Sequence, residues 1–261
     1  MPIPEDLGKF ESLVSIIARL RAPDGCPWDR EQTHTTLRVN LLSEAYEVLE
    51  ALDAGDDDEL CEELGDLLLQ IVLHAQIARD EGEFEIADVI RGICTKIIGR
   101  HPHIFGDTEV NSSREVMVNW EALKKIEKPE RASMLEGVPK AMPSLDYAYE
   151  IQRRVARVGF DWEDMDGVIE KLAEEVREIR EANDKDELAD EYGDLLFTLA
   201  NIIRRDGIDP ETALREANRK FYKRFAYMEE LCRQRGYTFG ELTFKEQNDL
   251  WNEAKDGVDA K

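Results

Sequence analysis

Residues 171–194 read KLAEEVREIREANDKDELADEYGD, and this stretch decides the fold of the second half of the chain. Leu172, Val176 and Ile179 recur at the spacing of one helix face, which predicts an amphipathic helix. The same spacing recurs further along the chain, at Leu188, Leu195, Leu196 and Leu199. Residues 183–185 form a polar turn between the two runs, with Asp184 as a suitable N-cap. The stretch therefore predicts a helical hairpin.

Two pairs of acidic residues lie on this predicted hairpin. Glu175 and Glu178 are three residues apart and share a helix face, and Glu191 and Asp194 repeat that spacing. If the helices are antiparallel, the two pairs come to nearly the same height and can face each other. Facing carboxylates repel unless some are protonated or a hard divalent cation lies between them. The pattern therefore predicts a metal site, with solvated surface glutamates as the alternative.

The composition of the whole chain is that of a helical protein of the cytoplasm. Its 261 residues suffice for one large or two small domains. We expect no membrane partner, because no apolar run could span a bilayer and the N-terminus has no signal-peptide pattern. The four scattered cysteines form no C-x-x-C pair, which fits a reducing compartment. The net charge of −24 disfavours a nucleic-acid polymer as partner, although it allows a small anionic substrate.

Apolar periodicity predicts helices along most of the chain and requires no strands, so the expected fold class is all-α. A helix is expected after the turn at 55–58, and another from Asp209 to about Arg235. The other expected helices cover about residues 5–21, 35–54, 86–99, 113–126, 147–158 and 244–254. Residues 127–143 hold three prolines and no sustained periodicity, which is typical of a linker. We therefore expect an N-terminal domain of residues 1–126 and a C-terminal domain of residues 144–261.

The two halves share one plan, which indicates an internal duplication. Each half has a Trp and Asp pair, an E-x-x-E pair, an E-x-G-D group, a K-x-x-x-R pair and a later tryptophan. In the first half these are Trp28, Asp29, Glu44, Glu47, Glu63, Asp66, Lys96, Arg100 and Trp120. In the second half they are Asp161, Trp162, Glu175, Glu178, Glu191, Asp194, Lys220, Arg224 and Trp251. The repeat predicts two tandem helical-bundle domains with equivalent sets of metal ligands.

Each recurring feature suits the binding of a nucleotide. The carboxylates can hold Mg²⁺, which often bridges to substrate phosphates. Lys220 and Arg224 share a helix face and could bind the outer phosphates of a polyphosphate, with an ordinary basic surface as the alternative. Trp120 and Trp251 offer flat surfaces on which a base could stack, with a core tryptophan as the alternative.

The second-half signature is Glu174-Glu175-x-x-Glu178 followed by Glu191-x-x-Asp194. Together with GCPWD at 25–29, RHPHIF at 100–105 and GFDW at 159–162, it resembles the two-domain MazG nucleoside triphosphate pyrophosphohydrolases. The resemblance covers nearly the whole chain. It implies an all-α homodimer that hydrolyses a broad range of ribo- and deoxynucleoside triphosphates to a monophosphate and pyrophosphate. It also implies dependence on Mg²⁺.

The resemblance also assigns residues to roles. It implies that Glu175, Glu178, Glu191 and Asp194 bind the metal, and the repeat extends this to Glu44, Glu47, Glu63 and Asp66. The segments that match nucleotide contacts comprise Lys171, Leu172, Ala173, Glu174, Glu175, Glu187, Leu188, Ala189, Asp190, Asp194, Lys220, Phe221, Tyr222, Lys223, Arg224 and Trp251. Their first-half counterparts are Lys96, Arg100 and Trp120.

The expected mechanism is metal-assisted hydrolysis. Mg²⁺ polarises the α-phosphate and activates a water, and Glu174 accepts the proton. Lys220 and Arg224 offset the charge on the departing pyrophosphate. Ser43 stands in the first half where Glu174 stands in the second, so we expect the second half to carry most of the activity.

Two other classes of protein remain as alternatives. A di-iron carboxylate bundle would need Glu-x-x-His pairs on its helices, and no acidic pair here has a histidine at that offset. A non-catalytic nucleotide sensor or helical interaction module is the second alternative, above all for the first half. His101 and His103 flank a proline and have no counterpart in the second half, so we expect a structural role for them.

Overall fold

The computed structural model describes residues 3–110, 112, 115–116, 119–120, 123 and 133–259. Every regular element in these ranges is helical and none is a strand, which confirms the all-α class. Among these helices none is both long and apolar enough to cross a membrane. The chain divides into two compact units, Met1–Pro129 and Glu130–Lys261, and this boundary falls inside the expected linker.

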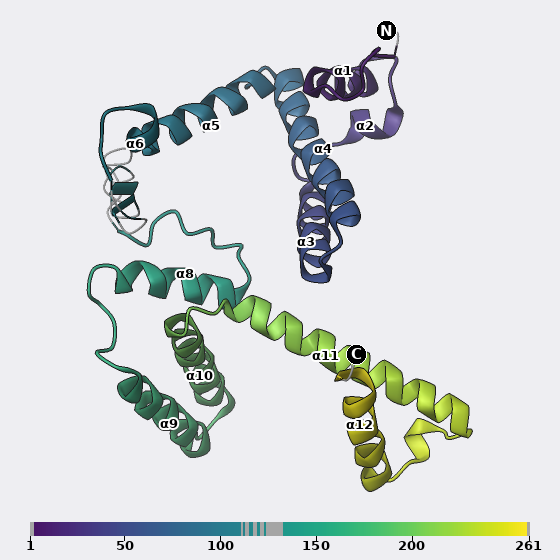
Figure 1. The fold of residues 1–261 in the computed structure, drawn as a ribbon, viewed down its shortest axis with the longest axis vertical. Coiled ribbons are helices and arrows are strands. Elements are labelled where there is room, and N and C mark those ends of the chain that lie inside the picture. Colours follow the sequence, from purple (N-terminus) through teal and green to yellow (C-terminus); the bar gives the residue numbers. More distant parts are fainter. Residues whose placement is uncertain are drawn as a thin grey trace. The chain divides into compact units, whose positions relative to one another are not determined.

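The first unit is built around an antiparallel pair of helices, α3 and α4 (Figure 1). Its elements are α1 (Phe10–Arg21), α2 (Pro27–Glu31), α3 (Arg38–Ala54), α4 (Asp57–Glu81), α5 (Ile86–Arg100) and α6 (Pro102–Phe105). Gly55 ends α3 with a φ of 68°, a conformation that glycine adopts without steric cost. Asp56 then caps α4 by accepting from the N–H groups of Asp58 and Glu59, so the chain reverses within two residues.

The hydrophobic core of the first unit lies at the end of this pair that is remote from Gly55. Its buried residues come from α1, from the start of α3 and from the C-terminal half of α4, namely Ile17, Leu37, Val72, Leu73 and Ile77. The acidic residues of α3 and of the N-terminal half of α4 therefore lie outside the main apolar core.

Several expected boundaries in the first unit were wrong. Helix α1 begins at Phe10 and not at residue 5, because Asp6 accepts a hydrogen bond from the Gly8 N–H at 3.0 Å and forms a turn. Helix α3 begins at Arg38 because Thr33 and Thr36 exchange hydrogen bonds between hydroxyl and backbone N–H. The short helices α2 and α6 were not predicted. Most of the helix expected near 113–126 lies outside the described residues.

The second unit repeats the helical pair as α9 and α10 (Figure 1). Its elements are α8 (Ser144–Ala156), α9 (Met165–Glu181), α10 (Lys185–Arg205), α11 (Pro210–Arg235), the 3₁₀-helix η1 (Phe239–Glu241) and α12 (Phe244–Asp259). Asp184 caps α10 as predicted, because its carboxylate accepts from the N–H groups of Asp186 and Glu187 at 2.9 Å each. Helix α8 packs against α10, where Gln152 donates to the Phe197 carbonyl at 2.8 Å.

A separate apolar cluster joins α12 to the C-terminal half of α11. Its buried residues are Met228, Leu231, Cys232, Leu250 and Ala254. Trp251 packs against this cluster while remaining half-buried. The structure thus gives Trp251 a packing role, the alternative to base stacking, and leaves part of its ring accessible.

Candidate active site

Acidic side chains of α9 and α10 meet on the facing sides of the second hairpin. The name "second-half cluster" is used here for Glu175, Glu178, Glu191 and Asp194. Carboxylate oxygens of Glu175, Glu191 and Asp194 lie within 4.8 Å of one another, and Glu178 lies outside this group. Desolvation and the charges of Glu178, Glu175 and Asp194 raise the pKa of Glu191 above its usual value. All four carboxylates therefore share one electrostatic environment.

Lys171, one helical turn before Glu175, neutralises part of this charge. Its Nζ lies 2.7 Å from Glu175 Oε1, 2.9 Å from Glu174 Oε1 and 3.9 Å from Glu178 Oε2. The hydrogen bonds to Glu175 and Glu174 raise the pKa of Lys171 further above neutrality. The same Lys171 bond lowers the pKa of Glu174. Lys171 is therefore a fixed positive charge among the carboxylates.

One oxygen of the second-half cluster has no partner among the described residues. The side chain of Glu175 is only 1% exposed, and its Oε2 is buried without a hydrogen bond. A buried carboxylate oxygen without a partner is costly. Because Glu191 and Asp194 bring further oxygens close to Glu175, the donor set consists of oxygen alone, which Mg²⁺ prefers. The cluster therefore fits a hard divalent cation.

A cavity of about 240 Å³ lies beside the second-half cluster. It is lined by Trp162, Lys171, Glu175, Asp194, Phe197, Thr198 and Asn201. The segment that carries Trp162 is fastened to α10, because Asp161 accepts from Arg204 at 2.7 Å and the Trp162 carbonyl accepts from Arg205 at 2.8 Å. The cavity is thus lined by charged side chains (Lys171, Glu175 and Asp194) and by aromatic ones (Trp162 and Phe197).

Three residues of this cavity were not predicted from the sequence. Phe197, Thr198 and Asn201 follow Asp194 by three, four and seven positions, which places them on the same face of α10. The spacing from Asp194 was the only sequence signal that these three residues lie near the cluster. Their side chains are apolar or neutral, so their chemistry did not mark them as site residues.

The first half reproduces the acidic arrangement with different hydrogen-bond partners. The name "first-half cluster" is used here for Glu44, Glu47, Glu63 and Asp66. Oxygens of Glu44, Glu47 and Glu63 lie within 4.8 Å of one another, and Asp66 lies outside the group. Desolvation and neighbouring carboxylates, Asp66 among them, raise the pKa values of Glu44 and Glu63. Glu63 Oε2 is buried without a partner in the described part of the chain, as Glu175 Oε2 is in the second half.

Among the residues that the structure describes, no lysine pairs with the first-half cluster as Lys171 pairs with the second. Asn40 stands four residues before Glu44, whereas Lys171 stands four residues before Glu175. Glu44 instead accepts from Gln70 Nε2 at 3.3 Å, and Glu47 accepts from the Ser43 hydroxyl at 2.8 Å. Neutral donors thus replace the ammonium group.

The basic pairs and later tryptophans form a second arrangement that recurs in both halves. The guanidinium carbon of Arg224 lies 5.8 Å from the centroid of the Trp251 ring, and that of Arg100 lies 5.3 Å from the Trp120 ring. Such arginine–tryptophan stacking is a cation–π contact. Neither Arg224 nor Trp251 lines the cavity beside Lys171. In each half an arginine of the basic pair therefore stacks on the later tryptophan, a contact that was not predicted, and in the second half this pair lies outside the cavity lining.

The remaining predicted nucleotide contacts lie mostly at the surface. Glu187 stabilises the hairpin turn, because its Oε2 accepts from the N–H and the side-chain amide of Asn183 at 2.8 and 3.0 Å. The half-buried positions are Leu172 and Leu188. The exposed positions are Ala173, Ala189, Asp190, Lys220, Phe221, Tyr222, Lys223 and Lys96.

Comparison with known proteins finds one family model in each half of the chain and relatives that span nearly all of it. The model of the MazG nucleotide pyrophosphohydrolase domain matches residues 32–105, and that of phosphoribosyl-ATP pyrophosphohydrolase matches residues 152–221. The nucleoside triphosphate pyrophosphohydrolase/pyrophosphatase MazG of Thermotoga maritima is 48% identical over 95% of this chain and 96% of its own. The nucleoside triphosphate pyrophosphohydrolase of Escherichia coli K12 is 40% identical over 95% of this chain and 98% of its own.

A solved structure also matches part of the chain. The crystal structure of a mazG-related protein from Thermotoga maritima covers 44% of this chain and 98% of its own, at 33% identity and a TM-score of 0.40. Each of the two matched sequence segments contains one acidic hairpin. On the strength of the full-length relatives, the chain belongs to the MazG family of nucleoside triphosphate pyrophosphohydrolases.

Proposed function

We propose that this chain hydrolyses nucleoside triphosphates to monophosphates and pyrophosphate in a reaction that requires Mg²⁺. The substrate range is broad and includes ribo- and deoxynucleotides. Family membership supports the hydrolysis of a phosphoric anhydride. The observation that most supports a cation is Glu175, whose buried Oε2 lacks a partner among the described residues within a set of oxygen ligands.

The second-half cluster holds the cation in this proposal. Glu175, Glu191 and Asp194 would supply the oxygens that already lie close together, and Glu178, whose charge acts on Glu191, would be the fourth ligand. Bound there, Mg²⁺ supplies positive charge and Lewis acidity at the α-phosphate.

Lys171 and Glu174 change partners when substrate binds. Their hydrogen bond lowers the pKa of Glu174 and so weakens it as a base. If a cation compensated Glu175, Lys171 would be available to contact a phosphate oxygen with its ammonium. Glu174, whose side chain is 46% exposed, then regains basicity and accepts a proton from the attacking water.

Lys220 and Arg224 bind the outer phosphates, and Trp251 contacts the base. Two positive charges one helical turn apart on α11 match the charge that develops on departing pyrophosphate. The exposed part of the Trp251 ring gives a base a flat apolar surface. These residues lie outside the cavity lining, so the nucleotide must extend from the cluster toward α11.

A second copy of the chain covers the apolar face of the second hairpin. Large apolar side chains of α9 and α10 are at least 40% exposed, namely Val176, Tyr192, Leu196 and Leu199. A face of this kind is typical of an interface between subunits. Analytical ultracentrifugation of the full chain should give a dimer, and a monomer at micromolar concentration would contradict this part of the proposal.

Product analysis tests the proposed reaction. The purified chain is incubated with a panel of ribo- and deoxynucleoside triphosphates, with Mg²⁺ or with excess chelator, and products are separated by anion exchange. Monophosphate and pyrophosphate should appear only with Mg²⁺. Diphosphate and orthophosphate would contradict the assigned bond cleavage, and full turnover in chelator would contradict the cation.

A second function, nucleotide binding without turnover, suits the first half. Ser43 and Gln70 donate hydrogen bonds to Glu47 and Glu44, and the doublet glutamate that corresponds to Glu174 is absent. A variant whose second-half cluster is disabled should then bind nucleotide and release no product.

A further inference from the structure

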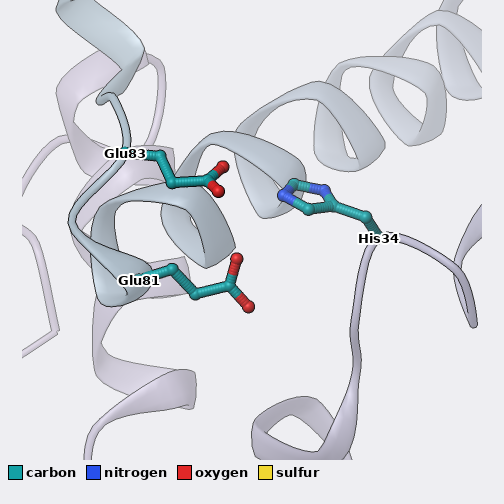
Figure 2. Close-up of side chains that lie close together, drawn as sticks. All are labelled: His34, Glu81 and Glu83. Carbon is teal, nitrogen blue, oxygen red and sulfur yellow. The ribbon is translucent and has the colours of Figure 1, made fainter.

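Apart from the two acidic clusters, one histidine and two glutamates converge at the C-terminal end of α4. His34 lies in the loop between α2 and α3, Glu81 is the last residue of α4, and Glu83 follows Gly82. One candidate ligand atom from each lies within 4.8 Å of the other two. Figure 2 shows the carboxylates of Glu81 and Glu83 directed toward one edge of the His34 ring. The three residues therefore form a compact N,O,O donor set.

Direct bonding does not account for this convergence. Within the described part of the chain, no hydrogen bond or ion pair joins His34 to Glu81 or Glu83. Two carboxylates at this separation repel each other, and both lie at a helix C-terminus, where the helix dipole is already negative. A cation between the three side chains would remove both costs.

The ring of His34 is held in an orientation that suits a ligand. Its Nδ1 lies 2.7 Å from Nδ1 of His74, and the two rings are inclined by only 4°. When His34 donates its Nδ1–H to His74, its Nε2 lone pair is free. Figure 2 shows this outer ring nitrogen on the side of the carboxylates. Metal-binding histidines commonly donate their second ring N–H to a fixed acceptor in this way.

The backbone on the glutamate side is fixed as well. Gly82 adopts a φ of 76°, and its N–H donates to the Arg79 carbonyl at 3.1 Å. The next N–H, that of Glu83, donates to the Ala78 carbonyl at 2.9 Å. This helix-ending turn requires the left-handed conformation of glycine and brings the flanking Glu81 and Glu83 to the same side.

The loop that carries His34 is held from the opposite side. Arg21 of α1 donates to the backbone carbonyls of Asp29 and Gln32, just before His34. The paired threonines at 33 and 36 fix the turn around it. All three donors therefore stand on a backbone fixed by hydrogen bonds that do not depend on a ligand.

We propose that His34, Glu81 and Glu83 bind a divalent transition-metal ion, with zinc as the natural probe. One imidazole nitrogen with two carboxylate oxygens suits zinc and its neighbours, whereas Mg²⁺ selects oxygen ligands alone. The chain therefore carries two kinds of cation site, the oxygen-only clusters and this mixed site. A metal here would tie the loop after α2 to the C-terminal end of α4, whereas the first-half cluster uses residues of the N-terminal half of α4.

Zinc titration of the full chain in saturating Mg²⁺ tests the proposal. Calorimetry gives stoichiometry and affinity, and ¹H–¹⁵N correlation spectra of the histidine rings identify the ligand, since the chain has only four histidines. We expect the signal of His34 Nε2 to shift on zinc binding. His34→Gln should remove the binding event, and His74→Phe should weaken it about 10–100-fold by removing the hydrogen-bond partner of His34 Nδ1.

Two further sets of variants keep the test decisive. Glu81→Gln and Glu83→Gln replace exposed side chains, so the fold should survive, and each should weaken zinc binding by a similar factor. His101→Gln is the matched control, because His101 and His103 form the other histidine pair, with ring centroids 5.6 Å apart. The proposal is overturned if zinc shifts His101 or His103 instead, or if both glutamine variants bind zinc as the unaltered chain does.

Discussion

At the scale of single residues, Lys171 is the side chain that most clearly separates the second half from the first. Its ammonium compensates the buried Glu175, whereas the equivalent Glu44 receives only the amide of Gln70. The i, i+4 spacing of Lys171 and Glu175 is visible in the sequence. Whether the pair is exposed or buried depends on how α10 packs against α9. The residues around Lys171 and Glu175 in the sequence do not show this packing.

Lys171→Met should destabilise the protein in chelator and much less in Mg²⁺. Without its ammonium, Glu175 is left buried with no donor, which typically costs about 1–3 kcal/mol. A bound cation replaces the missing charge. Urea denaturation in chelator and in Mg²⁺ measures both values, with Asn40→Met as the matched change in the first half. Equal destabilisation in the two buffers would show that Lys171 does not substitute for a cation.

The affinity for Mg²⁺ should fall as the pH is lowered from neutrality toward the raised pKa of Glu191. Desolvation and the neighbouring carboxylates raise this pKa above the usual 4.5, so protons compete with the cation at pH values above 4.5. Without a cation, the pH dependence concerns the stability of the folded state, and it has the opposite sign to that of Mg²⁺ affinity. Because the pKa of Glu191 is raised in the folded state, its protonation stabilises that state. This stabilisation is complete below pH 4.5 and is lost as the pH rises through the folded-state pKa.

Calorimetric titration with Mg²⁺ at several pH values between about 5 and 8 measures this dependence. Glu191→Gln is the control, since an amide does not titrate and part of the pH dependence should vanish with it. An affinity that is constant across the range would contradict the coupling.

At the scale of elements, the hairpins could be predicted because their signals are local. Apolar spacing defined both helices of the second hairpin, and Asp184 caps α10 as expected. The starts of α1 and α3 could not be placed, because Asp6 and Thr33 form turns that compete with the helix. Contacts distant in sequence, such as the pairing of His34 with His74, leave no local pattern at all.

Arg21→Met should destabilise the first unit more than Arg19→Met does. The Arg21 side chain is 9% exposed, pairs with Asp80 at 2.8 Å and donates to the part-buried carbonyls of Asp29 and Gln32, so its loss removes the donor that these groups share. Because Arg21 donates to three acceptors at once, we expect Arg21→Met to cost about 1–3 kcal/mol. Arg19, on the same helix, pairs with the exposed Asp24 and should cost at most about 1 kcal/mol. Urea denaturation of both variants measures the difference, and equal effects would contradict the role assigned to Arg21.

At the scale of the whole molecule, the sequence predicts the internal duplication. It predicts the differences between the two copies only in part. The absence of a doublet glutamate at Ser43 was visible in the sequence. The hydrogen bond from Ser43 to Glu47 could not be predicted from the sequence. Nor could the sequence predict which carboxylate lies outside the close group of three, which is Glu178 in the second half and Asp66 in the first. Those details depend on rotamers that neighbouring charges select.

The two halves should differ sharply in their contribution to hydrolysis. Glu178→Gln and Glu47→Gln each keep the size of the side chain and remove one charge at equivalent positions of the repeat. Neither side chain is buried, so both variants should fold, which circular dichroism checks. We expect Glu178→Gln to abolish most nucleoside triphosphate hydrolysis and Glu47→Gln to leave most of it.

The reason for this expectation is the residue beside each glutamate. Glu174 can accept a proton in the second half, and loss of a general base typically costs about 10²–10⁴-fold in rate. A serine hydroxyl cannot do this at neutral pH, and Ser43 is already engaged as a donor to Glu47 at 2.8 Å. If a bound cation alone sufficed to activate the water, the first half would be competent despite Ser43. In that case Glu47→Gln would prove at least as damaging as Glu178→Gln, and the assignment of the second half as the main catalytic site would be wrong.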